Sequence, residues 1–358
     1  MNSLTYARAG DVPDYVREVA ANLIANAQTQ FAAAQGETEP GQRRFLLADA
    51  RRLSSEALRI EPLNGTAAEL REQSGALLSE MDAIFDLGPP ATVTTLGSAV
   101  TGDVSVEAVR VHGGRAYLLD TRGGRIIAAP LDGTPVQVVF QKDQTYGGVI
   151  ARAPLQFTWE GPDETGRLLV LDEERKLFEV RPGSEPRSLP LRRTGTWSSV
   201  GGIATYDANF YVLDPRANQV HRYRPAAEGF DSEPDVILAG QIELEAAVGL
   251  AVDGDVYVVL ETGQVRRFQN GADAGFGLAG IDRPISAASD IAVVAANAEV
   301  FIADSGNKRV VVAGKDGVFR RQLVSSAFTD IRALGVDSAG AQLYVVIGDA
   351  LLTAAIVR

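Results

Sequence analysis

One pattern recurs along about three quarters of the chain, and it limits the possible folds more than any other feature. Two short apolar runs flank a tight turn in each copy, and VFIADSGNKRVVVAGKDG (300–317) is the clearest example. The copies align on a large apolar residue that returns every 42 to 52 positions: Tyr117, Leu169, Tyr211, Tyr257, Phe301 and Tyr344. Such runs predict β-strands, and a period of about 43 residues is typical of a repeated four-stranded sheet.

The six copies predict a mainly β fold, a six-bladed β-propeller over residues 91–358. Each copy begins with a strand of small apolar residues, such as VEAVRV (106–111), which suits an innermost strand that crowds a central channel. The last copy ends one strand short at Arg358, whereas ATVTTLG (91–97) supplies one strand before the first copy. We therefore expect strand 91–97 to complete the last blade and close the ring without open sheet edges.

Residues 1–90 precede the repeats and carry a helical period. After Pro13, apolar residues recur three or four positions apart: Val16, Val19, Leu23, Ala27 and Phe31. Breaks at GETEPG (36–41) and EPLNG (61–65) divide the segment into three amphipathic helices, and LGPP (87–90) ends it. Because the connections are short, neighbouring helices should be antiparallel, as in a helical bundle or stalk.

Composition removes several classes of function. The formal charge of −12, without any basic cluster, excludes nucleic acid as a partner. The chain has no cysteine, so disulfides, thiolate zinc sites and cysteine nucleophiles are excluded. No apolar run approaches the ~20 residues that span a bilayer, so we expect a soluble chain without direct membrane insertion. It could be cytoplasmic, or the extracytoplasmic part of a membrane-anchored protein.

Two stretches resemble known repeat families. ARRLSSEALRIEPLNGTAAELREQ (50–73) resembles a tetratricopeptide-type helix pair. The stretch 300–317 and the turn after it resemble the NHL repeat, through Val300, Ala303, Asp304, Gly306, Asn307, Arg309, Val310, Asp316, Gly317 and Phe319. NHL-like propellers are mostly binding modules, and the whole arrangement resembles sensor regions of bacterial receptor-type serine/threonine kinases or phosphatases. The wider six-bladed group also contains metal-dependent lactonases and lyases.

An aspartate returns at the end of the second strand in four copies: Asp120, Asp172, Asp214 and Asp304. A ring of metal ligands or bases is one interpretation. The other is structural, because Asp at a strand end accepts backbone N–H bonds from the following turn, and the glycine, proline or asparagine nearby favours it. The two histidines, His112 and His221, are interpreted as surface or turn residues and not as catalytic ones.

The loops that enter each blade vary most between copies, and they carry the predicted ligand-binding residues: Tyr146, Arg192, Trp197, Arg283 and Phe328. Exposed aromatic rings beside arginine are enriched in binding hot spots. Each ring could instead cover the underside of its own loop, an interpretation that we favour for Phe328. Arginine and lysine at hairpin tips on the same face would steer a small acidic ligand, glycan, peptide or protein toward it.

The main functional hypothesis is therefore a non-catalytic binding or sensing module without a cofactor, in which the helices act as a linker or as a site of homo-oligomerisation. A second hypothesis is a hydrolase, lactonase or lyase with a metal in the central channel, where Glu107, Asp290 and Asp330 could converge from the starts of innermost strands. A third is a scaffold for protein partners.

Overall fold

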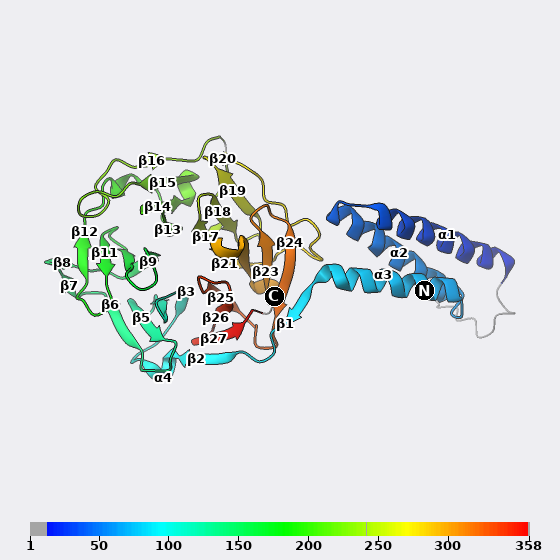
Figure 1. The fold of residues 1–358 in the computed structure, drawn as a ribbon, viewed down its shortest axis with the longest axis horizontal. Helices are drawn as coiled ribbons and strands as arrows, with labels where there is room; N and C mark the ends of the chain where they lie inside the picture. Colours follow the sequence, from blue (N-terminus) through cyan, green and yellow to red (C-terminus); the bar gives the residue numbers. More distant parts are fainter. Residues whose placement is uncertain (1–12, 241, 357–358) are drawn as a thin grey trace. The chain divides into compact units, whose positions relative to one another are not determined.

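The structure is a computed structural model that describes residues 13–240 and 242–356 (Figure 1). The chain forms two compact units. The first contains the N-terminal helices together with the short segments Leu278–Pro284 and Val318–Arg321, and the second contains the remaining residues from Phe85 onward.

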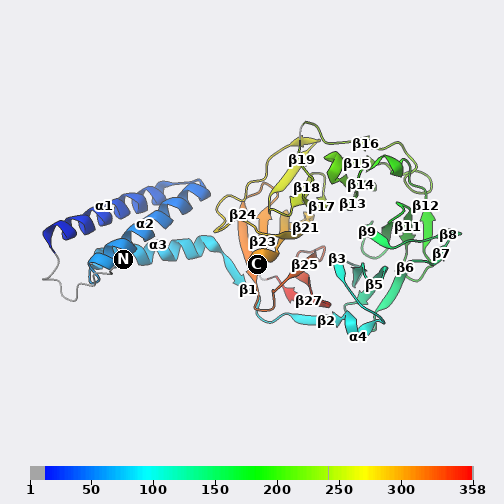
Figure 2. The same ribbon diagram turned by 180° about the vertical axis from the view of Figure 1, so that it is seen from behind.

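Three long helices form the first unit: α1 (Asp14–Gly36), α2 (Pro40–Ile60) and α3 (Gly65–Asp82). Helix α2 packs against both α1 and α3, and Figure 2 shows the three side by side. Side chains cap the second and third helices at their N-termini. The Glu39 carboxylate accepts the N–H groups of Gly41 and Gln42, and Asn64 Oδ1 accepts that of Ala67. The predicted three-helix segment is present.

The buried face of α1 includes the predicted Ala27, but Ala20 is buried in place of the predicted Val19. Alanines seven residues apart, Ala20, Ala27 and Ala34, are at most 1% exposed, whereas Val19 is 48% exposed. Small side chains let two helix backbones approach closely, so the contact between α1 and α2 follows the alanines. The larger apolar residues Leu23 and Phe31 are only partly buried beside them.

The second unit is the predicted six-bladed β-propeller, with six sheets arranged around a common centre (Figure 1). In the first three blades the strands run outward in chain order. Blade 1 contains β3 (Val106–His112), β4 (Arg115–Asp120), β5 (Arg125–Pro130) and β6 (Gln137–Gln141). Blade 2 contains β9 (Pro154–Glu160), β10 (Arg167–Asp172), β11 (Leu177–Val180) and β12 (Arg187–Leu189). Blade 3 contains β13 (Gly202–Tyr206), β14 (Asn209–Asp214), β15 (Gln219–Tyr223) and β16 (Asp235–Val236).

The remaining blades follow the same plan. Blade 4 contains β17 (Ala247–Val252), β18 (Val256–Leu260), β19 (Val265–Gln269) and β20 (Ala272–Asp273). Blade 5 contains β21 (Ala288–Val294), β22 (Glu299–Asp304), β23 (Arg309–Gly314) and β24 (Phe319–Val324), with β1 (Ile84–Asp86) at its outer edge. Blade 6 contains β25 (Ile331–Val336), β26 (Gln342–Ile347), β27 (Ala350–Ala355) and β2 (Ala91–Thr95).

The last blade takes its outermost strand from the segment before the first blade. Strand β2 pairs antiparallel with β27, with Thr92 opposite Leu352 and Thr95 opposite Ala350. A short helical turn, α4 (Leu96–Ala99), follows β2, so the strand ends two residues earlier than the stretch 91–97 suggests. The domain boundary at residue 90 stays a prediction.

The core lies between neighbouring blades and not inside any single sheet. One cluster joins Tyr117 and Phe140 of blade 1 to Phe157 and Phe178 of blade 2. Similar clusters fill the junctions of blades 2 and 3, 3 and 4, 5 and 6, and 6 and 1. The innermost strands approach closely, since a Cβ on Gly249 would lie 3.0 Å from side-chain atoms of neighbouring strands. The small residues at the start of each repeat therefore have a steric cause.

Candidate functional site

The four repeated aspartates are fully buried and join each second strand to the loop that enters the same blade. Asp120 Oδ1 accepts the N–H groups of Ser105 (2.9 Å) and Gly123 (3.0 Å). Asp172 accepts those of Arg152 and Lys176, one on each carboxylate oxygen. Asp214 and Asp304 likewise accept N–H groups from their incoming loops. The contacts are those of carboxylates that brace turns.

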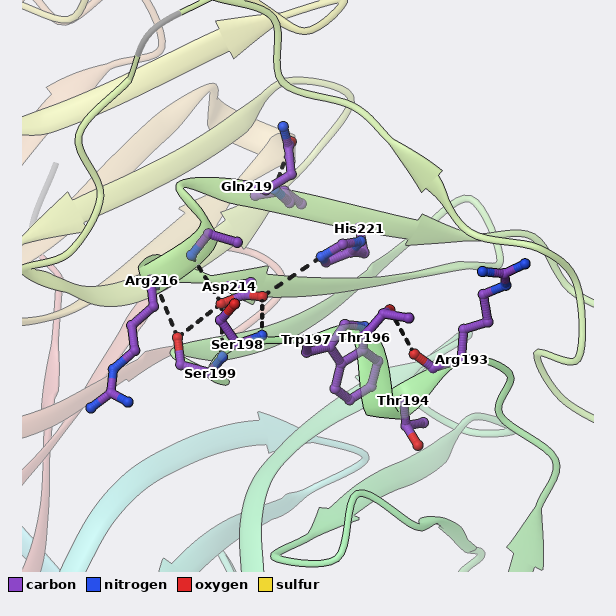
Figure 3. A network of polar contacts seen from close by, with 12 residues as sticks. Arg193, Thr194, Thr196, Trp197, Ser198, Ser199, Asp214, Arg216, Gln219 and His221 are labelled. Carbon is purple, nitrogen blue, oxygen red and sulfur yellow. Dashed lines mark hydrogen bonds and ion pairs between the residues drawn. The ribbon is translucent and has the colours of Figure 1, made fainter.

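The cation beside this aspartate differs between blades. Asp120 and Asp304 each accept the Nε–H of an arginine five residues later, at 2.7 Å. Blade 3 has Gln219 at that position, and His221 Nε2 lies 3.9 Å from Asp214 Oδ2 (Figure 3). Both ring nitrogens of His221 are buried without a hydrogen-bond partner. Burial lowers the pKa of His221, and the Asp214 charge opposes that shift.

The rings of Trp197 and Phe328 are both buried, which is the interpretation favoured above for Phe328 and one of the two left open for Trp197. Trp197 is 3% exposed, and its Nε1–H donates to the Tyr223 hydroxyl at 3.0 Å (Trp197 in Figure 3). Phe328 is 2% exposed and belongs to the core between blades 5 and 6. Both rings fill blade junctions, and neither presents a face to a ligand.

The other three predicted ligand-binding residues are Arg192, Tyr146 and Arg283. Arg192 is about half exposed, and its Nε lies 3.3 Å from a carboxylate oxygen of Glu233. Tyr146 is half-buried between blades 1 and 2, and its hydroxyl accepts the Gln141 N–H at 3.0 Å. Arg283 belongs to the first compact unit. Arg192 and Tyr146 are thus each engaged with protein groups of their own unit.

The acidic residues considered for a metal are also held by protein groups. Asp290 accepts the N–H groups of Ile291 (2.8 Å) and Leu334 (3.2 Å), and its Oδ2 lies 3.4 Å from an Arg110 nitrogen. Burial raises the pKa of Asp290. Glu107 and Asp330 both lie within 3.9 Å of Arg332. Over residues 13–240 and 242–356, no group of three acids or histidines could hold a metal ion.

Two cavities follow one another along the central channel. The starts of innermost strands surround a cavity of about 180 Å³, where Glu107 and Asp290 lie but Asp330 does not. The opposite ends of those strands, from all six blades, surround a second cavity of about 340 Å³, called here the channel cavity. Arg110 lines both, so its ion pair with Asp290 lies where the cavities meet.

The channel cavity combines apolar walls with few polar groups. Its apolar lining includes Ile203, Ala204, Leu250, Ala251, Val252 and Ile291. Strand β3 contributes Arg110 and His112, two residues apart and therefore on one side of the strand. In the adjacent blade 6, the loop after β25 contributes Asp337 and Ser338. The innermost strands of the propeller thus enclose a cup with a few polar groups on its wall.

His112 is held on several sides by protein groups. Its Nδ1 lies 2.8 Å from Asp163 Oδ1, and Ser338 Oγ donates to the other oxygen of Asp163 at 3.1 Å. The imidazole stacks on the Trp159 indole with 5.1 Å between ring centroids and 6° between planes. Tyr117 packs against the same indole. Residues of blades 1, 2 and 6 therefore fix the ring, whose side chain is 28% exposed.

His112 was expected at the surface or in a turn, and its place in this cavity was not predicted. One signal was present. In VEAVRVH the polar Arg110 and His112 occupy alternate positions of an innermost strand whose other residues are mainly small and apolar. Polar side chains at channel-facing positions of such a strand indicate a polar function in the channel. The partners Asp163 and Ser338 lie 51 and 226 positions beyond His112, so no local pattern joins them to it.

Two further hollows lie at the junction of blades 1 and 2, on the same side of the propeller as the channel cavity. They measure about 330 and 490 Å³, and Arg115, Tyr117 and Pro182 line both. The 330 Å³ hollow also reaches Trp159, which lines the channel cavity as well. The junction of blades 1 and 2 therefore carries two hollows beside the channel cavity.

No known protein family and no curated protein matches the chain. Solved structures do. A protein of unknown function from Bacteroides thetaiotaomicron is 12% identical, with a TM-score of 0.54 over 74% of this chain and 75% of that one. Virginiamycin B lyase from Staphylococcus aureus is 13% identical, with a TM-score of 0.50 over 72% and 97%. The WD40 propeller domain of Doa1 is 12% identical, with a TM-score of 0.47 over 74% and 96%.

At this level of identity the comparisons show the propeller fold alone. Because one fold can host unrelated functions, the fold by itself does not separate a binding protein from an enzyme. None of the helices within the described ranges is long and apolar enough to cross a membrane. A more specific function has to be argued from the side chains of the channel cavity.

Proposed function

We propose that this protein is a non-catalytic binding module that takes a small molecule into the channel cavity. The observation that carries the proposal is the cavity itself. Its volume of about 340 Å³ falls in the range of about 300–1,000 Å³ typical of ligand pockets, and a few convergent polar groups interrupt its apolar walls. Its polar groups come from different blades, so the closed ring holds them in place without a ligand.

In this proposal the propeller recognises the ligand, and the helices before residue 90 serve as a linker or an oligomerisation element. The resemblance of residues 300–317 to the NHL repeat supports a binding role, and the resemblance of the whole arrangement to bacterial receptor sensor regions supports a sensing one. A scaffold for protein partners is the alternative. A scaffold would use the outer surfaces of the propeller, so occupancy of the channel cavity separates the two roles.

The test uses anisole, a small uncharged aromatic ether, as the probe. The chain has two tryptophans, Trp159 on the cavity wall and Trp197 in a blade junction. In ¹⁵N-labelled protein we expect the Trp159 indole signal to shift and saturate with added anisole while the Trp197 signal stays in place. The Trp159→Phe variant assigns the two signals.

A matched pair of variants provides the control. Ala251→Phe fills the cavity and should weaken anisole binding at least about tenfold, because the apolar space is removed. Ala355→Phe adds the same side chain at an exposed position of β27 and should leave binding unchanged. If the Trp159 signal does not move, or if Ala251→Phe binds anisole as the parent protein does, the proposed function is wrong.

A further inference from the structure

Resting on the proposed function, we infer that the channel cavity selects small uncharged ligands that carry an O–H or N–H group, and that His112 Nε2 accepts the hydrogen bond from that group. The inference names the chemical class of the ligand and the atom that recognises it. It follows from the tautomer of His112, from the fixed position of the ring and from the charges around it.

The tautomer follows from the hydrogen bond at the other nitrogen. A carboxylate oxygen accepts, so the 2.8 Å contact between Nδ1 and Asp163 places the ring proton on Nδ1. Ser338 donates to the second oxygen of Asp163 and so holds the carboxylate in place. In the neutral ring Nε2 then carries a lone pair. Within the part of the chain that the structure describes, no protein group donates to Nε2.

The ring is held before a ligand arrives. Its face lies against the Trp159 indole, and Tyr117 packs on the same indole with 5.4 Å between ring centroids. Asp163 fixes rotation within the ring plane. An acceptor held in one orientation loses little conformational freedom on binding, so its hydrogen bond contributes more to affinity than that of a mobile side chain.

The surrounding charges disfavour an anion. Burial lowers the pKa of His112, which favours the neutral ring, and the negative charge of Asp163 lies directly behind that ring. The positive charge of Arg110 is balanced by Asp290 at 3.4 Å. A carboxylate in the cavity would therefore meet a lone pair on Nε2 and a net negative surrounding. An uncharged donor such as a hydroxyl or an amide avoids both penalties.

Two other polar side chains on the wall, Thr205 and Asp337, are bonded to protein groups. The Thr205 hydroxyl donates to the Trp159 carbonyl oxygen. Asp337 Oδ1 accepts the N–H groups of Ala341 (2.6 Å) and Gln342 (2.9 Å). Nε2 of His112 is therefore the acceptor nitrogen that the cavity offers to a ligand. The apolar walls contact the apolar part of the ligand. His112 distinguishes ligands of the same size by whether they carry a hydrogen-bond donor.

The experiment compares phenol, anisole and benzoate at neutral pH, with the Trp159 indole signal as the readout. Phenol and anisole share an aromatic body, but only phenol carries a donor, and benzoate adds a negative charge. We expect phenol to bind at least about fivefold more tightly than anisole, the ratio that one ordinary hydrogen bond gives. Benzoate should bind more weakly than either.

Variants assign the preference to His112. His112→Phe keeps an aromatic ring against Trp159 but removes the acceptor, so anisole should still bind and the preference for phenol should vanish. His221→Phe changes the histidine outside the cavity and should leave the preference intact. Asp163→Ala frees the tautomer and should reduce the preference without removing it. Anisole binding shows in each variant that the cavity is intact.

The outcomes separate this inference from the proposed function. If phenol and anisole bind the parent protein equally, or if His112→Phe keeps the preference, the inference is wrong while a binding cavity remains. If benzoate binds more tightly than phenol, the cavity is an anion site governed by Arg110, and the inference is wrong. If no probe moves the Trp159 signal, the proposed function fails and the inference falls with it.

Discussion

The chain's two histidines lie in the same propeller and each faces an aspartate, yet their surroundings are built differently. His112 lies on an innermost strand, 2.8 Å from Asp163, with one nitrogen bonded and the ring stacked on Trp159. His221 lies on the third strand of its blade, 3.9 Å from Asp214, with both nitrogens buried and unpaired. Burial lowers the pKa of both.

The difference teaches that a shifted pKa does not by itself mark a functional site. The aspartate near His221 is bonded to the backbone, since Asp214 accepts N–H groups from Ser198, Ser199 and Ala217 (Figure 3). The histidine only packs beside it. The aspartate near His112 is bonded to side chains instead, since Asp163 contacts the imidazole ring and accepts from Ser338. An aspartate that accepts backbone N–H groups is a structural brace, whereas an aspartate that holds a histidine ring in place indicates a binding group.

Replacing each of the two aspartates should give the largest difference in the free energy of unfolding. Asp214→Ala leaves several buried N–H groups without an acceptor and should lower the free energy of unfolding by about 3 kcal/mol. Asp163→Ala removes a side chain that is 34% exposed and should lower it by less than about 1 kcal/mol. Urea unfolding followed by circular dichroism measures both. Equal losses in the two variants would remove the distinction between brace and binding group.

The pH dependence of stability should follow from both histidines. Each has a folded-state pKa below its ordinary value of 6.5, so the unfolded chain binds protons more readily as the pH falls. The contribution to stability is therefore complete above pH 6.5 and is lost as the pH falls toward the folded-state pKa. Urea midpoints measured between about pH 5 and about pH 8 should decline toward acid.

The variant His221→Leu tests the share of the buried histidine in that decline. Below pH 6.5, the urea midpoint of this variant should fall less steeply with pH than that of the parent protein. His112→Leu should also reduce the slope, because the same sign applies to its lowered pKa. An unchanged slope in both single variants would mean that other groups govern the acid loss of stability.

The smallest expected effect concerns stability at about pH 8, where both histidines are neutral. His221→Leu replaces two unpaired buried nitrogens with apolar atoms and should be neutral or stabilising by about 0.5–1 kcal/mol. His112→Leu breaks the bond to Asp163 and should destabilise by about 1 kcal/mol. Thermal unfolding at that pH compares the two. A destabilised His221→Leu variant would show that its nitrogens have partners after all.

Much of the fold could be predicted from local pattern. The six repeats predicted six blades because alternation of apolar residues and turn glycines is a property of neighbouring residues. The inner face of α1 could not be predicted as well. Apolar spacing selected Ala27 correctly but also Val19, whereas packing against α2 buries Ala20 and Ala34, because close contact between helices favours small side chains.

The candidate site was less predictable than the fold. Trp197 and Arg192 are near neighbours in a variable loop, which is why they were predicted to bind a ligand. In the structure the Trp197 ring packs into a blade junction, and Arg192 pairs with Glu233. The direction of a loop side chain depends on the blades beneath it. Asp290 shows the same limit, since it belongs to blade 5 while its partners Arg110 and Leu334 come from blades 1 and 6.

The sequence by itself determined the repeat, the strands, the turns and the acidic brace of four blades, because each depends on residues within one blade. Only the tertiary structure decided where a cavity forms and which polar groups meet in it. Ring closure brings residues 112, 163 and 338 together from blades 1, 2 and 6. Contacts between such distant positions arise from the packing of whole blades, and no local period records them.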